Sequence, residues 1–220
     1  MRESIRQFVR LVAETLPVPE PIFEFGAFQV PSQVGFADLR PLFPGKEYVG
    51  CDMREGPGVD RILNLHRIDL PSASVGTVLV LDTLEHVEYC REAVAEIHRI
   101  LRPDGLVVAS SVMNYQIHEY PADYWRFTPE GFKSLLSPFA FSFVGAAGEA
   151  EFPHTVVGVG VKGEIAKGSL EEFTRGFEAW KRDWTDPPPP APPRTWKTHV
   201  KPLLPPALLT AYRKMRGRVS

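Results

Sequence analysis

Residues 78–112 read VLVLDTLEHVEYCREAVAEIHRILRPDGLVVASSV, and this stretch decides the fold. It opens within a continuously apolar run, as a parallel strand buried on both faces does. Residues 90–102 place Ala93, Ile97 and Ile100 on one face of an amphipathic helix. A Pro-Asp-Gly turn ends this helix, and a second apolar run then predicts another strand. Strand, helix and strand in this order indicate a parallel βαβ unit.

The flanking sequence continues the alternation of strands and helices. Apolar runs at 21–26, 48–53 and 61–65 predict three strands before the unit, and runs at 140–149 and 155–163 predict two after it. The last two runs have no helix between them, so they should pair antiparallel. The sequence therefore predicts a doubly wound α/β sheet.

Helical patterns lie at 3–15, at 32–43 with Ser32 as a cap, and at 128–139 with Thr128 as a cap. We expect one domain over residues 1–163, including the first helix. A C-terminal extension over 164–220 should hold another helix, a Pro-rich linker at 187–193 and a basic terminal helix.

Charge is distributed unevenly over the chain, whose formal net charge is −2. No Asp or Glu follows Asp186, whereas seven Lys or Arg residues do, so the body is acidic and the tail basic. An acidic body does not suggest nucleic-acid binding. The tail could lie on an anionic membrane or on a protein partner, or it could be a solvated segment.

The two cysteines, Cys51 and Cys90, show no metal-binding spacing. The sequence shows no signal peptide and no apolar run of membrane-spanning length. A reducing cytoplasm is the expected compartment.

Polar residues directly follow several predicted strands, where ligands bind in sheets of this type. Asp52 ends the second strand, and a carboxylate there can accept both hydroxyls of a ribose. The alternative is a carboxylate that only caps a turn.

Four stretches together resemble the class I S-adenosylmethionine-dependent methyltransferases, in particular the broad type-11 group. They are FEFGAF, YVGCDMREGPGVDRILNLHRIDLP, VLVLDTLEHVEYCREAVAEIHRILRPDGLVVASSV and IHEYPADYWRFTPEGFKSLL, and the resemblance covers residues 20–163. It implies a Rossmann-like sheet of seven strands, of which the last is antiparallel. It also implies an enzyme that uses S-adenosyl-L-methionine.

The resemblance assigns the cofactor to positions that match the family motifs. These are Glu24, Gly26, Ala27, Phe28, Asp52, Met53, Asn64, Leu65 and Asp82. By the same resemblance, the loop after Glu24 approaches the methionine part, Asp52 the ribose, Asn64 the adenine and Asp82 the methionine amino group.

The sequence departs from the family pattern at Phe28 and Val30, where glycines allow close approach of the backbone to a ligand. Phe28 could swing outward and cover the cofactor. Alternatively, it could fill the pocket and abolish binding.

His118 is the predicted catalytic residue, because an imidazole near neutral pH can take a proton from a hydroxyl. The alternative is a rigid lid built from residues 118–127. Asp82, Glu85 and His86 form a D-x-x-E-H pattern that, with His118, could hold a divalent ion. The pattern alone also fits a loop that only shapes the site, so no metal is assigned.

We therefore expect methyl transfer to a small acceptor, most simply a hydroxyl on a saccharide or another small metabolite. A non-catalytic protein of the same fold, acting as a binding module, is the alternative.

Overall fold

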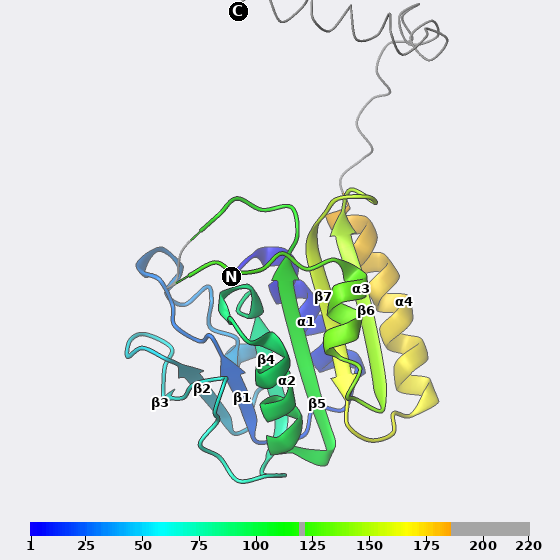
Figure 1. The fold of residues 1–220 in the computed structure, drawn as a ribbon. Helices are drawn as coiled ribbons and strands as arrows, with labels where there is room; N and C mark the ends of the chain where they lie inside the picture. The colour runs from blue at the N-terminus through cyan, green and yellow to red at the C-terminus, as the bar shows by residue number, and fades with distance from the viewer. Residues whose placement is uncertain (119–121, 186–220) are drawn as a thin grey trace, which may run out of the picture. The chain divides into compact units, whose positions relative to one another are not determined.

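The computed structural model describes residues 1–118 and 122–185 (Figure 1). Its sheet has seven strands in the order β3-β2-β1-β4-β5-β7-β6. The strands are β1 (Ile22–Phe25), β2 (Tyr48–Asp52), β3 (Arg61–Ile62), β4 (Val75–Leu81), β5 (Leu101–Val112), β6 (Phe141–Gly148) and β7 (Pro153–Val161). β7 runs antiparallel to both β5 and β6, and the other pairs are parallel. The predicted Rossmann-like topology is confirmed.

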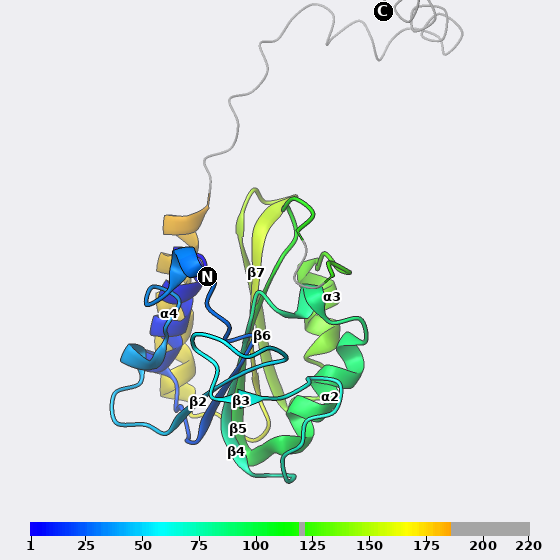
Figure 2. The same ribbon diagram turned by 90° about the vertical axis from the view of Figure 1, so that its left-hand side faces the viewer.

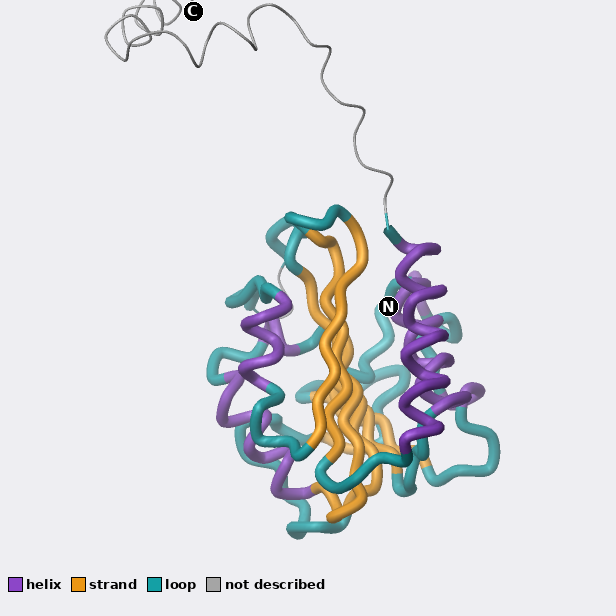
Figure 3. Tube along the Cα trace, turned by 90° about the vertical axis from the view of Figure 1, so that its right-hand side faces the viewer, coloured by secondary structure: helices purple, strands orange, loops and turns teal. Residues whose placement is uncertain are grey.

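Four α-helices cover the sheet: α1 (Glu3–Thr15), α2 (Cys90–Ile100), α3 (Pro129–Leu135) and α4 (Lys167–Trp184). α1 and α4 lie on one face, and α2 and α3 lie on the other (Figures 2 and 3). The compact unit extends to Asp186. The predicted Pro-rich linker at 187–193 and the basic terminal helix lie outside the described residues.

The α1–α4 face is closed by aromatic packing. Phe8 of α1 meets the rings of Phe173, Phe177 and Trp180 of α4 at centroid distances of 5.4 to 6.4 Å. The indole N–H of Trp180 also donates to the carbonyl of Ser4 at 2.8 Å. Residues 167–184, which the sequence placed in the extension, therefore contribute to the core of this unit.

The opposite face follows the sequence patterns closely. All seven residues of β4 are buried, as a central parallel strand requires. α2 buries Ala93, Ile97 and Ile100 against the sheet. Thr128 caps α3 by accepting a hydrogen bond from the Gly131 N–H at 3.0 Å.

The predicted helix at 32–43 is wrong. This region forms two short 3₁₀ turns, Pro31–Gln33 and Arg40–Leu42, and Ser32 caps no helix. Gly35 has a φ of +82°, which interrupts a right-handed helix, and Pro41 removes a backbone donor. Sequence periodicity missed both interruptions.

Within the part of the chain that the structure describes, none of the helices combines the length and the apolar composition needed to cross a lipid bilayer.

Candidate functional site

The carboxyl ends of the central strands open into one cavity of about 520 Å³. A volume of this size can hold a small-molecule ligand. All the residues singled out from the sequence line it: Glu24, Gly26, Ala27, Phe28, Asp52, Met53, Asn64, Leu65, Asp82 and His118. The fold therefore brings together side chains that are up to 94 positions apart in the sequence.

The loop after β1, residues 26–30, starts with Gly26, a position where any other residue would be strained. Gly26 has a φ of +85°, and a Cβ there would lie 2.2 Å from the Thr83 hydroxyl oxygen. Its N–H and that of Ala27 both donate to the Cys51 carbonyl, at 2.9 and 3.0 Å. The Gln29 N–H donates to Pro57 at 2.8 Å. These three donors hold the loop against the neighbouring segment.

The loop has no glycine after Gly26, but the segment that it packs on has two, Gly56 and Gly58. A Cβ on Gly58 would lie 2.3 Å from the Ala27 carbonyl oxygen, and one on Gly56 would lie 2.3 Å from the Phe28 ring. The Arg54 guanidinium lies over the same ring, 4.4 Å from its centre. Phe28 thus packs on Arg54 and Gly56 and also lines the cavity.

Asp52 ends β2 at the edge of the cavity, and its side chain is 12% exposed. Oδ1 accepts a hydrogen bond from the Arg54 backbone N–H at 3.1 Å and lies 3.4 Å from its Nε. Oδ2 accepts a longer bond from the Phe28 N–H at 3.4 Å. The carboxylate therefore still has acceptor capacity for a ligand hydroxyl.

Asn64 is held in a turn next to Leu65. Its side-chain oxygen accepts the His66 backbone N–H at 2.9 Å and lies 3.2 Å from His66 Nδ1. Leu65 is buried, whereas Met53 is 59% exposed at the rim. This side of the cavity offers an amide and apolar surface, as a flat heterocycle requires.

Glu24 is buried beneath the β1 loop and accepts a hydrogen bond from the Tyr48 hydroxyl at 2.6 Å. Burial raises the pKa of Glu24 to about 7, although the Tyr48 bond lowers it. The side chain therefore carries a proton in much of the neutral range and acts mainly as a buried support.

Asp82 follows β4 with a φ of +45° and pairs with Arg2 of the first helix region. The two carboxylate oxygens accept Arg2 Nη2 at 2.8 Å and Nε at 3.1 Å, and Ser110 adds a hydroxyl donor at 2.8 Å. Burial raises the pKa of Asp82, but Arg2 and Ser110 outweigh it and leave the pKa below its usual value. Sequence reasoning missed Arg2, because no local pattern connects it to a residue 80 positions away.

Glu85 and His86 form the turn after Asp82. Glu85 is fully buried, and its Oε2 accepts the Ser111 hydroxyl at 2.7 Å. Burial and then the charge of Asp82 raise the pKa of Glu85 to about 8. His86 directs Nδ1 to the Ala122 carbonyl at 2.6 Å, and burial lowers its pKa, so its ring is neutral at pH 7.

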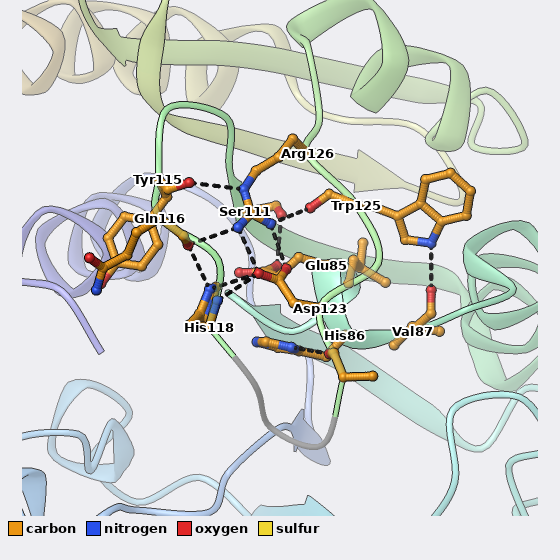
Figure 4. Close-up of polar contacts among 12 residues, drawn as sticks. Glu85, His86, Val87, Ser111, Tyr115, Gln116, His118, Asp123, Trp125 and Arg126 are labelled. Carbon is orange, nitrogen blue, oxygen red and sulfur yellow. Dashed lines mark hydrogen bonds and ion pairs between the residues drawn. The ribbon is translucent and has the colours of Figure 1, made fainter.

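His118 lies beyond β5 and faces His86, with ring centres 4.7 Å apart. Asp123 holds this segment by accepting the His118 backbone N–H at 2.8 Å and both terminal nitrogens of Arg126 (Figure 4). The Arg126 hydrogen bonds keep the pKa of Asp123 well below its usual range. Trp125 anchors the same segment through its indole N–H, which donates to the Val87 carbonyl at 3.0 Å.

The cavity thus has two sides. Asp52, Asn64 and the β1 loop form one, and the side chains after β4 and β5 form the other. Tyr115 and Thr83, which the sequence did not single out, also line it.

A family model described as "Methyltransferase domain" matches residues 44–109. No curated protein matches the chain. Solved structures share its fold at low sequence identity. The 1,6-didemethyltoxoflavin-N1-methyltransferase of Burkholderia thailandensis, with bound 1,6-didemethyltoxoflavin and S-adenosylhomocysteine, is 20% identical with a TM-score of 0.55, over 73% of this chain and 78% of that one.

A SAM-dependent methyltransferase from Archaeoglobus fulgidus gives 14% identity and a TM-score of 0.55, over 74% of this chain and 95% of that one. A chain from the Haloferax volcanii complex between the Trm112 methyltransferase activator and a methyltransferase is 16% identical with a TM-score of 0.53, over 74% of this chain and 91% of that one. The family-model match over residues 44–109 and the seven-stranded topology together show a Rossmann-like methyltransferase fold.

Proposed function

We propose that this protein transfers the methyl group of S-adenosyl-L-methionine to a hydroxyl of a small acceptor. The observation that carries the proposal is the convergence of Gly26, Asp52, Asn64 and Asp82 on one cavity of about 520 Å³. When bound, the cofactor supplies an electrophilic methyl group on a sulfonium. Everything else must come from residues of the chain.

The residues present fit the cofactor's chemical parts. Asp52 has acceptor capacity for ribose hydroxyls, and Asn64 with Leu65 offers an amide beside apolar surface for adenine. Asp82 and Arg2 carry opposite charges, which suit an amino-acid zwitterion. Phe28 packs on Arg54 and Gly56 at the wall of a cavity that still has about 520 Å³ of free volume.

His118 is the proposed residue for the acceptor proton. Its Nδ1 lies 3.2 Å from the Gln116 carbonyl, which can only accept, so Nδ1 carries the hydrogen and Nε2 is free to act as a base. Alignment of donor and acceptor in the cavity supplies most of the remaining rate.

Support for the alternative, a non-catalytic binding protein, comes from the β1 loop. Its first donors, Gly26 and Ala27, are paired with Cys51, and Gln29 is paired with Pro57, so none is available to a ligand. The open cavity and the acceptor capacity of Asp52 argue against this alternative.

The proposed acceptor is a saccharide or another small metabolite, in keeping with the small molecule bound in the Burkholderia structure. The Haloferax complex raises a protein partner as a second proposal. A reducing cytoplasm remains the proposed compartment, since Cys51 and Cys90 are both buried and unpaired.

Isothermal titration with S-adenosylhomocysteine tests the proposal first. We expect one site per chain. Release of S-adenosylhomocysteine from the methyl donor, measured over a panel of hydroxylated metabolites, then tests turnover. A folded chain that binds no S-adenosylhomocysteine would overturn the proposed methyl transfer and favour the non-catalytic alternative.

A further inference from the structure

Three possible metal ligands meet on the acceptor side of the cavity. Glu85 and His86 come from the turn after β4, and His118 comes from the segment after β5 (Figure 4). One ligand atom from each lies within 4.8 Å of the other two. Asp82, which the sequence pattern grouped with them, is instead paired with Arg2 and Ser110.

Both histidines are oriented by backbone carbonyls. Nδ1 of His86 lies 2.6 Å from the Ala122 carbonyl oxygen, and Nδ1 of His118 lies 3.2 Å from that of Gln116. Neither a carbonyl oxygen nor the Asp123 carboxylate, whose Oδ2 lies 3.3 Å from Nδ1 of His118, can donate, so each Nδ1 carries a hydrogen. In the neutral form of either ring the lone pair is on Nε2. Ligand histidines in metal sites are held by this kind of outer hydrogen bond.

Glu85 supplies a carboxylate with one unused oxygen. Its Oε2 accepts the Ser111 hydroxyl at 2.7 Å, whereas its buried Oε1 has no hydrogen-bond partner among the described residues. A buried polar atom without a partner is costly, so such an atom calls for an explanation. A cation beside Oε1 provides one.

We propose that Glu85, His86 and His118 form a binding site for a divalent transition-metal ion. Two imidazoles with one carboxylate suit Mn²⁺, Fe²⁺, Co²⁺ or Zn²⁺, whereas Mg²⁺ and Ca²⁺ prefer oxygen ligands. Donors at adjacent positions around an ion at about 2.1 Å are about 3 Å apart, so the ligand atoms, which lie within 4.8 Å of one another, must move closer together to bind an ion.

Three protein ligands leave coordination positions that face the cavity, because Glu85, His86 and His118 all line it. Water or an oxygen of the acceptor can occupy these positions, and this role toward the acceptor rests on the proposed function. The Nε2 lone pair of His118 cannot bind a metal and a proton at once. With the ion bound, the acceptor hydroxyl is acidified by the cation and releases its proton to water.

Metal binding can be measured without cofactor or acceptor. The untagged full chain, freed of metal by a chelator and dialysed, is titrated with Co²⁺, Mn²⁺ and Mg²⁺ by calorimetry, and Co²⁺ is also followed by its visible absorption. We expect one Co²⁺ per chain and weaker binding of Mg²⁺. Glu85→Gln, His86→Ala and His118→Ala should each weaken Co²⁺ binding by at least the about 10–100-fold that loss of an outer-shell partner costs.

Two substitutions outside the site serve as matched controls. His98 lies on α2 against the Phe139 ring, and Glu92 is exposed in the first turn of the same helix. His98→Gln and Glu92→Gln should bind Co²⁺ like the parent. His66 lines the cavity, but its Nε2 accepts the Tyr89 N–H at 3.2 Å, so His66→Gln should also have no effect.

Circular dichroism and thermal melts establish that each variant is folded. His118→Ala is the safest of the three, because the side chain is 26% exposed. Absence of a 1:1 Co²⁺ complex in the parent, or equal loss in site and control variants, would overturn the site. Binding of S-adenosylhomocysteine without Co²⁺ binding would overturn the metal site and leave the proposed function standing. Binding of Co²⁺ without S-adenosylhomocysteine binding would overturn the proposed function and leave the metal site standing.

Discussion

The loop after β1, residues 26–30, and the loop after β4, residues 82–86, lie at the same edge of the sheet but are held by different forces. Backbone hydrogen bonds and close contacts with glycines fix the β1 loop. Buried charged and polar side chains fix the β4 loop, through Asp82 with Arg2 and Glu85 with Ser111. The β1 loop is therefore defined by shape, and the β4 loop by charge.

Because of this difference, we expect the two loops to have different roles in ligand binding. A loop defined by shape gives a fixed surface for a ligand that is always the same, which suits a cofactor. A loop defined by charge can hold charged groups: Asp82 with Arg2 suits the amino-acid part of the cofactor, and Glu85 with His86 suits the acceptor end. Substitutions on the two sides should therefore change different measured quantities.

The largest expected effect is on the cofactor side. Under the proposed function, Asp52 accepts two charge-assisted hydrogen bonds from the ribose, each worth about 1.5–3 kcal/mol, and Asp52→Ala would remove both. We expect S-adenosylhomocysteine affinity, measured by calorimetry, to fall by at least about 10²-fold. The Co²⁺ affinity should stay unchanged, which serves as the internal control. Parent-like affinity in the variant would remove Asp52 from the cofactor site.

The reciprocal effect is expected on the acceptor side. His118→Ala should lower turnover by about 10²–10⁴-fold while S-adenosylhomocysteine affinity stays within a few-fold of the parent. His98→Gln is the matched control, since His98 does not line the cavity. A large loss of cofactor affinity in His118→Ala would break the division between the two sides.

A third prediction concerns pH. The pKa of Glu24 is about 7 in the folded chain against 4.5 as the reference value, so between these pH values only the folded state binds this proton. The contribution of Glu24 to the free energy of unfolding is therefore greatest below pH 4.5 and falls by about 3 kcal/mol as the pH rises to 7. Above pH 7 the contribution of Glu24 to the free energy of unfolding no longer changes with pH.

Urea denaturation of the parent and of Glu24→Gln, from pH 5 to 8.5, measures this contribution as a difference between two curves. Other titrating groups cancel in the difference. Parallel curves for parent and variant would show that Glu24 titrates normally and that the β1 side has no buried proton.

The smallest expected effect is that of Phe28→Gly. The ring contributes a cation–π contact with Arg54 of about 0.5–1 kcal/mol and packing over Gly56. Cofactor affinity should be unchanged or weakened up to about 10-fold. If the substitution created binding in a chain that has none, Phe28 would be a plug and the alternative function would be correct.

The elements that could be predicted from the sequence are those with strong local patterns. β4, α2 and β5 follow from a continuous apolar run, an amphipathic period and a second apolar run. The helix at 32–43 failed because Gly35 and Pro41 override a weak helical pattern. Sequence periodicity describes burial, and it describes backbone dihedrals only indirectly.

The site residues that could be predicted were likewise those with a local sequence pattern. Residues such as Asp52 and Asp82 could be named because they end predicted strands. Arg2 and the glycines of the 54–58 segment could not, since their roles depend on contacts between distant parts of the chain. A role that depends on contact with a residue far away in the chain cannot be predicted from a single sequence.

The packing of α4 on α1 has a consequence for how the chain folds during synthesis. The apolar face of α1, with Ile5, Phe8, Val9 and Val12, is covered in part by Phe173, Phe177 and Trp180. A ribosome adding about 5–20 residues per second needs roughly 8–35 s to pass from the first helix to the last. During that interval the part of this face that α4 later covers stays exposed, so we expect a ribosome-associated chaperone to bind the nascent chain there.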